Sequence, residues 1–319
     1  MAATTEVVRK KIDSTEIKPF HNFFRLRKGE QIVYVLGTNH SVSIDQLPTW
    51  AKSFILEAFA QSKFCVFEGK FQAYTRDMFE QEGCFLNANQ RKSPWFSRLL
   101  TPYQQQIRNM VEAVAARHGI TLQAEELLIP AVAKLLIQNL FEGGMDSNLQ
   151  CDYCGDKEVL YLNEPEDTDQ LIRITDCDQL PVDLDELLPL LESHFGSEAD
   201  ELREKIFADY LSGELPAFEA EELDELRAIN KRWVSKMMSR LNPEISFIAI
   251  GNAHLYQPPQ QNVLNQFRDL GFEIERLTLA GEYAPYTKNQ TFLPAQQGKG
   301  AKEARPGAAA SSPPTIKHK

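Results

Sequence analysis

Two short apolar runs stand near opposite ends of the chain, and both end in the same way. The first is Gln31-Ile-Val-Tyr-Val-Leu-Gly-Thr-Asn-His40, and the second is Ile245-Ser-Phe-Ile-Ala-Ile-Gly-Asn-Ala-His254. A short run rich in β-branched and other apolar residues predicts a buried strand, and a glycine at its end lets the chain turn sharply. We therefore predict two buried strands, each of which ends in Gly-x-x-His.

The segments that follow these two strands also share a pattern. A helix is predicted at 46–61, followed by a strand at 64–67 that ends at Glu68. A second helix is predicted at 260–270, and residues 272–277 then alternate as a strand. The pattern predicts an α/β fold whose central sheet is built from two related β-α-β units, each with a Gly-x-x-His strand end.

The long region between the two units carries mainly helical periodicity. Its most apolar helix is predicted at 124–140, and a short apolar run at 159–162 predicts a further strand. The last residues are rich in Gly, Ala, Ser, Pro and Lys with almost nothing apolar to bury, so they are predicted to form a disordered tail. The predicted organisation is a lead-in at 1–30, a first β-α-β unit at 31–71, a helical insert at 72–243, a second unit at 244–295 and the tail at 296–319, with 31–295 forming one domain.

Composition and charge narrow the class of protein. With 319 residues, of which 43% are hydrophobic, the chain can bury the core of an ordinary globular protein. A net charge of -11 argues against a nucleic-acid surface, which needs a clustered basic face. No apolar run is long enough to span a bilayer, and the N-terminus lacks the apolar segment of a secretory signal. We therefore expect a cytoplasmic protein, with export by a route that needs no signal peptide left open.

Three candidate site residues stand at the carboxyl ends of predicted strands, namely His40, Glu68 and His254. Ligands of open α/β sheets bind in the crevice outside these strand ends, so the three side chains are expected to converge. Two imidazoles and a carboxylate are a minimal ligand set for a metal ion that keeps a position open for water. A single histidine after a strand is more often a hydrogen-bonded turn residue, and a glutamate there can simply face solvent. The repetition of Gly-x-x-His favours one shared site.

The remaining histidines and the cysteines carry less information. The other four histidines, His194 among them, lie in predicted loops, at a helix end or in the tail, and are expected at the surface. Cys151-Asp-Tyr-Cys154 supplies only two of the four thiolates of a structural zinc site, and no second pair exists. A thioredoxin-like context for a redox pair is also absent. The odd total of five cysteines fits a reducing compartment.

Several short segments follow one another in a familiar order. The first are Gly37-Thr-Asn-His40, a helix led by Leu47-Pro48, and Phe67-Glu68. The later ones are Gly144-Met-Asp146, Val159-Leu-Tyr-Leu-Asn-Glu164, Asn230-Lys-Arg-Trp233, Phe247-Ile-Ala-Ile-Gly-Asn-Ala-His-Leu255 and Gly271-Phe-Glu-Ile-Glu275. In this order they resemble the motifs of the TraB/GumN/Tiki family, over roughly residues 30–280.

The resemblance implies a metal-dependent hydrolase. Tiki members are proteases that depend on manganese or cobalt and need both Gly-x-x-His histidines and the glutamate. For this chain it implies a peptide or protein substrate and a divalent ion (Mn, Co or Zn) held by the three candidate residues, which are also the catalytic ones. Asp146, Glu164 and Asn230 stand at motif positions and are candidates for orienting an imidazole or binding substrate. The wider superfamily includes a haem-binding lipoprotein, so the alternative is a non-catalytic or haem- or iron-binding protein of the same fold.

The chain also departs from the family pattern in three places. Ile229 stands where the family has an arginine. Arg227 or Arg232 would have to bind an anion or the substrate in its place. Glu164 lies one position later than the glutamate of the family's V-x-x-L-E strand. We expect neither the signal peptide nor the anchor of Tiki and GumN proteins, and so no extracellular Wnt-like substrate. Neither the substrate nor the oligomeric state is predicted.

Overall fold

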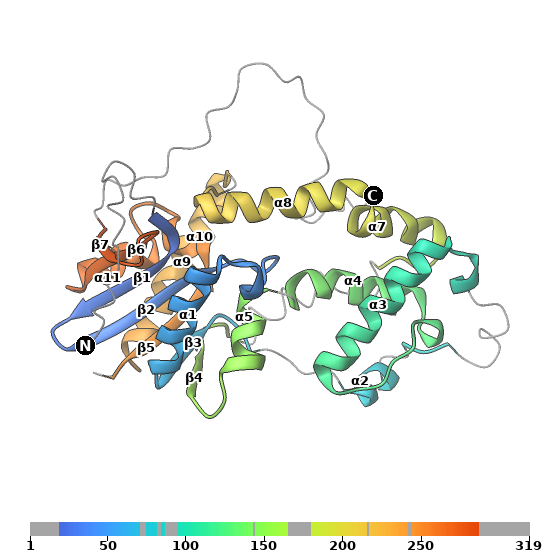
Figure 1. The fold of residues 1–319 in the computed structure, drawn as a ribbon, viewed down its shortest axis with the longest axis horizontal. Coiled ribbons are helices and arrows are strands. Elements are labelled where there is room, and N and C mark those ends of the chain that lie inside the picture. Colours follow the sequence, from blue (N-terminus) through green and yellow to red (C-terminus); the bar gives the residue numbers. More distant parts are fainter. Residues whose placement is uncertain are drawn as a thin grey trace, which may run out of the picture.

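The computed structural model describes most of the chain (Figure 1). The predicted tail at 296–319 lies outside the described residues, as do residues 1–18 of the lead-in. The described residues are 19–70, 75–81, 84–86, 95–142, 144–164, 180–215, 217–241 and 244–286.

One seven-stranded sheet forms the centre of the described structure. Its strands are β1 (Pro19–Lys28), β2 (Gln31–Thr38), β3 (Phe64–Phe67), β4 (Glu158–Tyr161), β5 (Ser246–Gly251), β6 (Glu273–Thr278) and β7 (Tyr283–Pro285). Their order across the sheet is β4-β3-β5-β2-β1-β6-β7. The first four of these are parallel, whereas β1 is antiparallel to both its neighbours and β7 is antiparallel to β6. The predicted α/β class is confirmed.

The two strands that end in Gly-x-x-His lie side by side in the middle of the sheet. β2 and β5 pair in parallel from Val33 opposite Ser246 to Thr38 opposite Gly251. Strands covered on both faces read as near-continuous apolar runs, which is why these segments stood out in the sequence. The register brings both Gly-x-x-His turns to the same edge of the sheet.

The strand order interleaves the segments that the sequence grouped into two units. β5 lies between β2 and β3, so the two strands of the first predicted unit do not pair with each other. β6, the second strand of the other unit, pairs with β1 and not with β5. β1 comes from the lead-in region and lies between β2 and β6, so it separates β6 from the four parallel strands.

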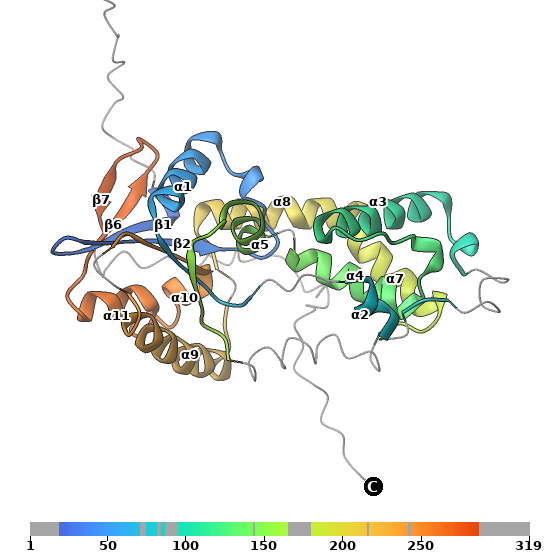
Figure 2. The same cartoon turned by 90° about the horizontal axis from the view of Figure 1, so that it is seen from below.

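Helices cover both faces of the sheet (Figure 2). Adjacent residues of a strand point to opposite faces, so Leu36 and Val35 of β2 belong to different cores. On the Leu36 side lie η1 (Ile44–Gln46), α1 (Thr49–Gln61), α5 (Met145–Asn148) and the end of α8 (Ser197–Ser212). On the Val35 side lie α9 (Ala220–Met238), α10 (Asn252–Tyr256) and α11 (Val263–Asp269).

A further group of helices packs around a core of its own beside the sheet (Figure 1). It comprises α2 (Arg76–Gln81), α3 (Thr101–His118), α4 (Ile129–Glu142) and α7 (Leu184–Phe195), with the short 3-10 helices η3 (Trp95–Arg98) and η4 (Ala124–Glu126). α8 follows α7 and runs from these helices to the sheet, where its Tyr210 is buried against β1 and β2.

Two expectations for the helical region are wrong. The most apolar helix, α4, begins at Ile129 and not at residue 124, because proline fits the first turn of a helix but not its interior, and Pro130 stands here. His194 was expected at the surface, but it is only 6% exposed and packs edge-on against Phe195. Burial, together with the charge of Arg203, lowers the pKa of His194 to about 4.

Replacing Tyr210 with phenylalanine tests the connection between α8 and the strand end of the first Gly-x-x-His motif. The Tyr210 hydroxyl donates a hydrogen bond of 2.7 Å to the Gly37 carbonyl in a fully buried position. Its loss leaves that carbonyl unsatisfied, so Tyr210→Phe should lower the free energy of unfolding by about 1–3 kcal/mol in urea denaturation. Tyr103→Phe is the matched control, because the Tyr103 hydroxyl bonds Glu192 at the surface and its removal should cost little. Equal losses in both variants would contradict this account.

Candidate functional site

The predicted site residues lie together at the carboxyl edge of the parallel strands. His40 follows β2, Glu68 follows β3, and His254 lies on α10, which begins directly after β5. Because β5 lies between β2 and β3, its turn is adjacent to both other strand ends. This is the edge of an α/β sheet at which ligands bind.

Glu68 lies between the two imidazoles. Its Oε2 atom is 3.7 Å from Nε2 of His40, and its Oε1 atom is 3.9 Å from Nε2 of His254. The three residues therefore form a row in which each histidine faces a different carboxylate oxygen. Within the described residues, no three His, Cys, Asp or Glu side chains form a group that could hold a metal ion as they stand.

The start of α5 holds His40. Asp146 Oδ2 lies 3.1 Å from Nδ1 of His40, while Asp146 Oδ1 is buried without a hydrogen-bond partner among the described residues. The backbone N–H of Met145 donates to the Asn39 carbonyl at 3.5 Å. Gly144 packs so closely on the turn that a Cβ atom there would lie 2.4 Å from the His40 carbonyl oxygen. Asp146, predicted as an orienting residue, is thus in place beside the first imidazole.

Helix α9 holds His254. Asn230 Oδ1 lies 2.7 Å from Nδ1 of His254, on the side of the ring away from Glu68. The Trp233 ring packs against the imidazole with the two ring centroids 4.3 Å apart. Asn230 and Trp233 are three positions apart and so lie on one face of the helix. Trp233 was not predicted as a site residue, although this spacing from Asn230 is a signal in the sequence that could have identified it.

A backbone amide of the second Gly-x-x-His motif binds Glu68. The N–H of Gly251 donates to Glu68 Oε1, and a Cβ atom at Gly251 would lie 3.0 Å from that oxygen. Burial raises the pKa of Glu68 and the charge of Asp146 adds to the rise, whereas the charge of His40 and the Gly251 hydrogen bond oppose it. The second glycine motif therefore supplies a carboxylate-binding N–H as well as a histidine.

The two imidazoles differ in their affinity for a proton. Burial lowers the pKa of His40, but the hydrogen bond to Asp146 and the charges of Asp146 and Glu68 outweigh burial and raise it to about 9. The His40 side chain is 44% exposed, so solvent screens part of this effect. Burial, with the charge of His40 added, lowers the pKa of His254 to about 3. These surroundings therefore favour the charged form of His40 and the neutral form of His254.

Other candidate residues have different surroundings. Glu164 forms an ion pair of 2.6 Å with Lys236 of α9. Ile229, at the position of the family arginine, packs against the apolar core on the Val35 side of the sheet. Arg227 pairs with Asp224 on the exposed side of α9. Of the two cysteines in the C-x-x-C segment, Cys151 is exposed and Cys154 is buried.

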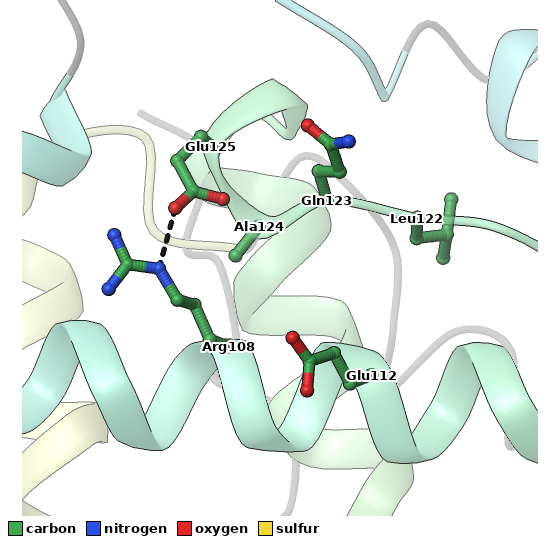
Figure 3. Close-up of a pocket in the computed structure, with 6 residues that line it drawn as sticks. All are labelled: Arg108, Glu112, Leu122, Gln123, Ala124 and Glu125. Atoms are coloured by element: carbon green, nitrogen blue, oxygen red, sulfur yellow. Dashed lines mark hydrogen bonds and ion pairs between the residues drawn. The ribbon is translucent and has the colours of Figure 1, made fainter.

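A pocket in the helical part is separate from the predicted site residues (Figure 3). Its volume is about 390 Å³, and an ion pair of 2.6 Å between Arg108 and Glu125 lies at its wall. It is lined by Arg108, Glu112, Leu122, Gln123, Ala124 and Glu125. None of these is a histidine or cysteine, and the single arginine is already paired with Glu125, so we assign no chemistry to this pocket.

The fold and the site define an α/β protein with a histidine–glutamate–histidine cluster at the carboxyl edge of its sheet. The model of the TraB/PrgY/gumN family matches residues 22–276, which is most of the chain and contains every residue of the cluster. The chain belongs to this family. Comparisons with curated proteins and with solved structures gave no match. Among the described residues, no helix combines the length and apolar character needed to cross a bilayer.

Replacing Gly144 with alanine tests whether the close approach of α5 sets the position of His40. The added methyl group would meet the His40 backbone, which cannot move aside as a flexible side chain can. We expect Gly144→Ala to lower the free energy of unfolding by about 1–3 kcal/mol in chemical denaturation. Gly69→Ala is the control at the same edge, because the nearest atom to its Cβ would be Asn163 Nδ2 at an ordinary 3.5 Å. A harmless Gly144→Ala change would show that this contact does not constrain the turn.

Proposed function

We propose that this protein is a metal-dependent hydrolase that cleaves peptide bonds. In this proposal, Nε2 of His40 and Nε2 of His254 hold a divalent ion, and Glu68 either completes the ligand set or acts as the general base. The proposal rests on the geometry of the cluster and on the resemblance of its motifs to those of the Tiki proteases.

The observation that carries the proposal is the orientation of the two imidazoles. Asp146 and Asn230 occupy the Nδ1 sides of the rings, so both Nε2 atoms face the same carboxylate. Their distances to Glu68, 3.7 and 3.9 Å, are too long for hydrogen bonds. A buried carboxylate is costly unless a positive charge lies next to it, and a divalent ion would add to the charge of His40. Two imidazole nitrogens and a carboxylate, with each imidazole held by an oxygen atom behind it, are the donor set of a divalent metal site.

The buried oxygen of Asp146 adds to this support. Asp146 Oδ1 has no hydrogen-bond partner among the described residues, although its other oxygen contacts His40. Such an atom usually has a water molecule or an ion as its partner. A cation bound at Nε2 of His40 would stabilise the charge of this carboxylate from across the imidazole ring.

Each residue of the cluster would have a separate role in hydrolysis. When bound, a divalent ion lowers the pKa of a coordinated water molecule from about 16 to near 7. Glu68 is close enough to both imidazoles to take the proton of a water molecule in the site. Asp146 and Asn230 keep the two rings in position. Nitrogen and oxygen donors do not choose among Mn, Co and Zn, so all three ions remain candidates.

Single and double histidine variants test whether one ion is shared. Because the lost ligands belong to one site, His40→Ala, His254→Ala and the double variant should lose metal binding to a similar extent in titration calorimetry. His118→Ala, which lies at the end of α3, should bind like the wild type. Wild-type binding in both single variants would mean that the two Gly-x-x-His turns are only a structural repeat. A Soret band in the purified protein would instead support the haem-binding alternative.

Replacing Glu68 with glutamine separates its two possible roles. If Glu68 is the general base, Glu68→Gln keeps its metal and loses hydrolysis of a peptide substrate by two to four orders of magnitude. If Glu68 is a ligand, the variant loses both. Metal content and peptide hydrolysis are measured on the same preparation. Full activity in Glu68→Gln would remove this residue from the mechanism.

The charge of His40 predicts how metal binding depends on pH. The raised pKa of His40, about 9, means that a proton must leave Nε2 before this nitrogen can bind an ion. Below that pKa, the apparent affinity should therefore rise by up to about tenfold for each pH unit. Asp146→Asn removes the charge that raises the pKa, so its binding should depend less on pH between 6 and 8. Titrations at several pH values measure this, and an affinity that is flat with pH in the wild type would contradict it.

A further inference from the structure

The side chain of Asn230 is completely buried, and both of its ends are engaged. Its Nδ2 atom lies 2.8 Å from the carbonyl oxygen of Gln257 and 3.3 Å from that of Gln261. Its Oδ1 atom lies 2.7 Å from Nδ1 of His254. The amide therefore connects α9 both to the loop between α10 and α11 and to one imidazole of the cluster.

The partners of the amide determine where the protons lie. A backbone carbonyl can only accept a hydrogen bond, so the end of Asn230 that faces two carbonyls must be the NH2 group. The other end must then be the carbonyl oxygen, which can only accept as well. The hydrogen bond to His254 therefore needs a proton on Nδ1, and a neutral imidazole with Nδ1 protonated has a free lone pair on Nε2.

The two carbonyls do not depend on His254 for their positions. The N–H of Gln257 donates to Ala253, and the N–H of Gln261 donates to Pro258. Asn262 also holds the loop, because its side-chain NH2 group donates to the carbonyls of Tyr256 and Pro259. The loop thus fixes the direction of the Asn230 amide, and the amide in turn fixes the imidazole.

We infer that Asn230 is a positioning residue that holds His254 in the Nδ1–H tautomer and presents an unprotonated Nε2 atom to the cluster. The use of that lone pair for a metal rests on the proposed function, whereas the tautomer itself follows from the hydrogen bonds. In the competing account, Asn230 only connects α9 to the loop, and His254 would keep its tautomer without it.

NMR spectroscopy of the metal-free full-length protein, labelled with ¹⁵N-histidine, tests the inference at pH 7.5. In the wild type, His254 should show a protonated Nδ1 and an unprotonated Nε2, and its signals are identified by their loss in His254→Gln. In Asn230→Ala a substantial Nε2–H population should appear, because the acceptor is gone. If the wild type shows Nε2–H, or if Asn230→Ala keeps only Nδ1–H, the inference is overturned.

Two further variants separate tautomer control from stability. Asn230→Asp keeps an acceptor beside Nδ1 but turns an oxygen toward two carbonyls, so Nδ1 should stay protonated, whether or not Nε2 also gains a proton, and the variant should melt at a lower temperature. Asn262→Ala removes the hydrogen bonds to Tyr256 and Pro259 and the N-cap of α11 but keeps both carbonyls that Asn230 contacts and their backbone bonds, so it too should melt lower with the tautomer unchanged. Should Asn230→Ala fail to fold, Asn230→Asp decides, because an unprotonated Nδ1 in that variant would refute the inference.

Metal titration links the tautomer to the proposed function. Removing an oxygen that orients a metal-binding histidine typically weakens metal binding by about 10- to 100-fold, and we expect a loss of this size in Asn230→Ala. Asn262→Ala should bind Mn²⁺ or Zn²⁺ like the wild type. If the wild-type protein binds neither ion, the proposed function fails, and the NMR result still decides the role of Asn230.

Discussion

The carboxylate of Glu68 is the constraint on which the rest of the site depends. A buried carboxylate is costly unless hydrogen bonds and positive charge surround it. Here the Gly251 N–H donates to Oε1, and His40, whose pKa is raised, lies beside Oε2. Together with Glu68, these groups come from three strand ends, which meet because β5 is paired with β2 on one side and with β3 on the other. The stabilisation of the Glu68 carboxylate therefore depends on the order of the central strands.

Local sequence was enough to identify the main members of the cluster. The repeated Gly-x-x-His and the strand that ends at Glu68 are visible as short apolar runs, and parallel strands bring such ends to one edge. The residues that contact the two imidazoles were harder to predict from the sequence. Asp146 and Asn230 were candidates because they stand in family motifs, but nothing local indicates that Asp146 meets His40 and Asn230 meets His254. Those pairings depend on how α5 and α9 pack on opposite faces of the sheet.

The wrong predictions for α4, His194 and the strand order also have physical causes. The start of α4 was placed too early because apolar periodicity was followed through Pro130, which belongs in a first turn. His194 was placed at the surface because a polar residue at a helix end usually is exposed, whereas here α3, α4 and α7 share a core. The sequence grouped strands by their order in the chain, but pairing between distant strands determines a sheet. That is why the position of β6 beside β1 was not foreseen.

The central place of β5 has a consequence for how the chain is made. Until residues 246–251 leave the ribosome, β1 and β2 can form only a hairpin, and β3 and β4 only a separate pair, because the strand that joins them is missing. Both partial sheets then have unpaired edges, which are prone to wrong association. Glu68 likewise lacks the Gly251 amide and His254 during this time. The nascent chain therefore carries no complete cluster, and the site forms only when the last parallel strand is inserted between the others.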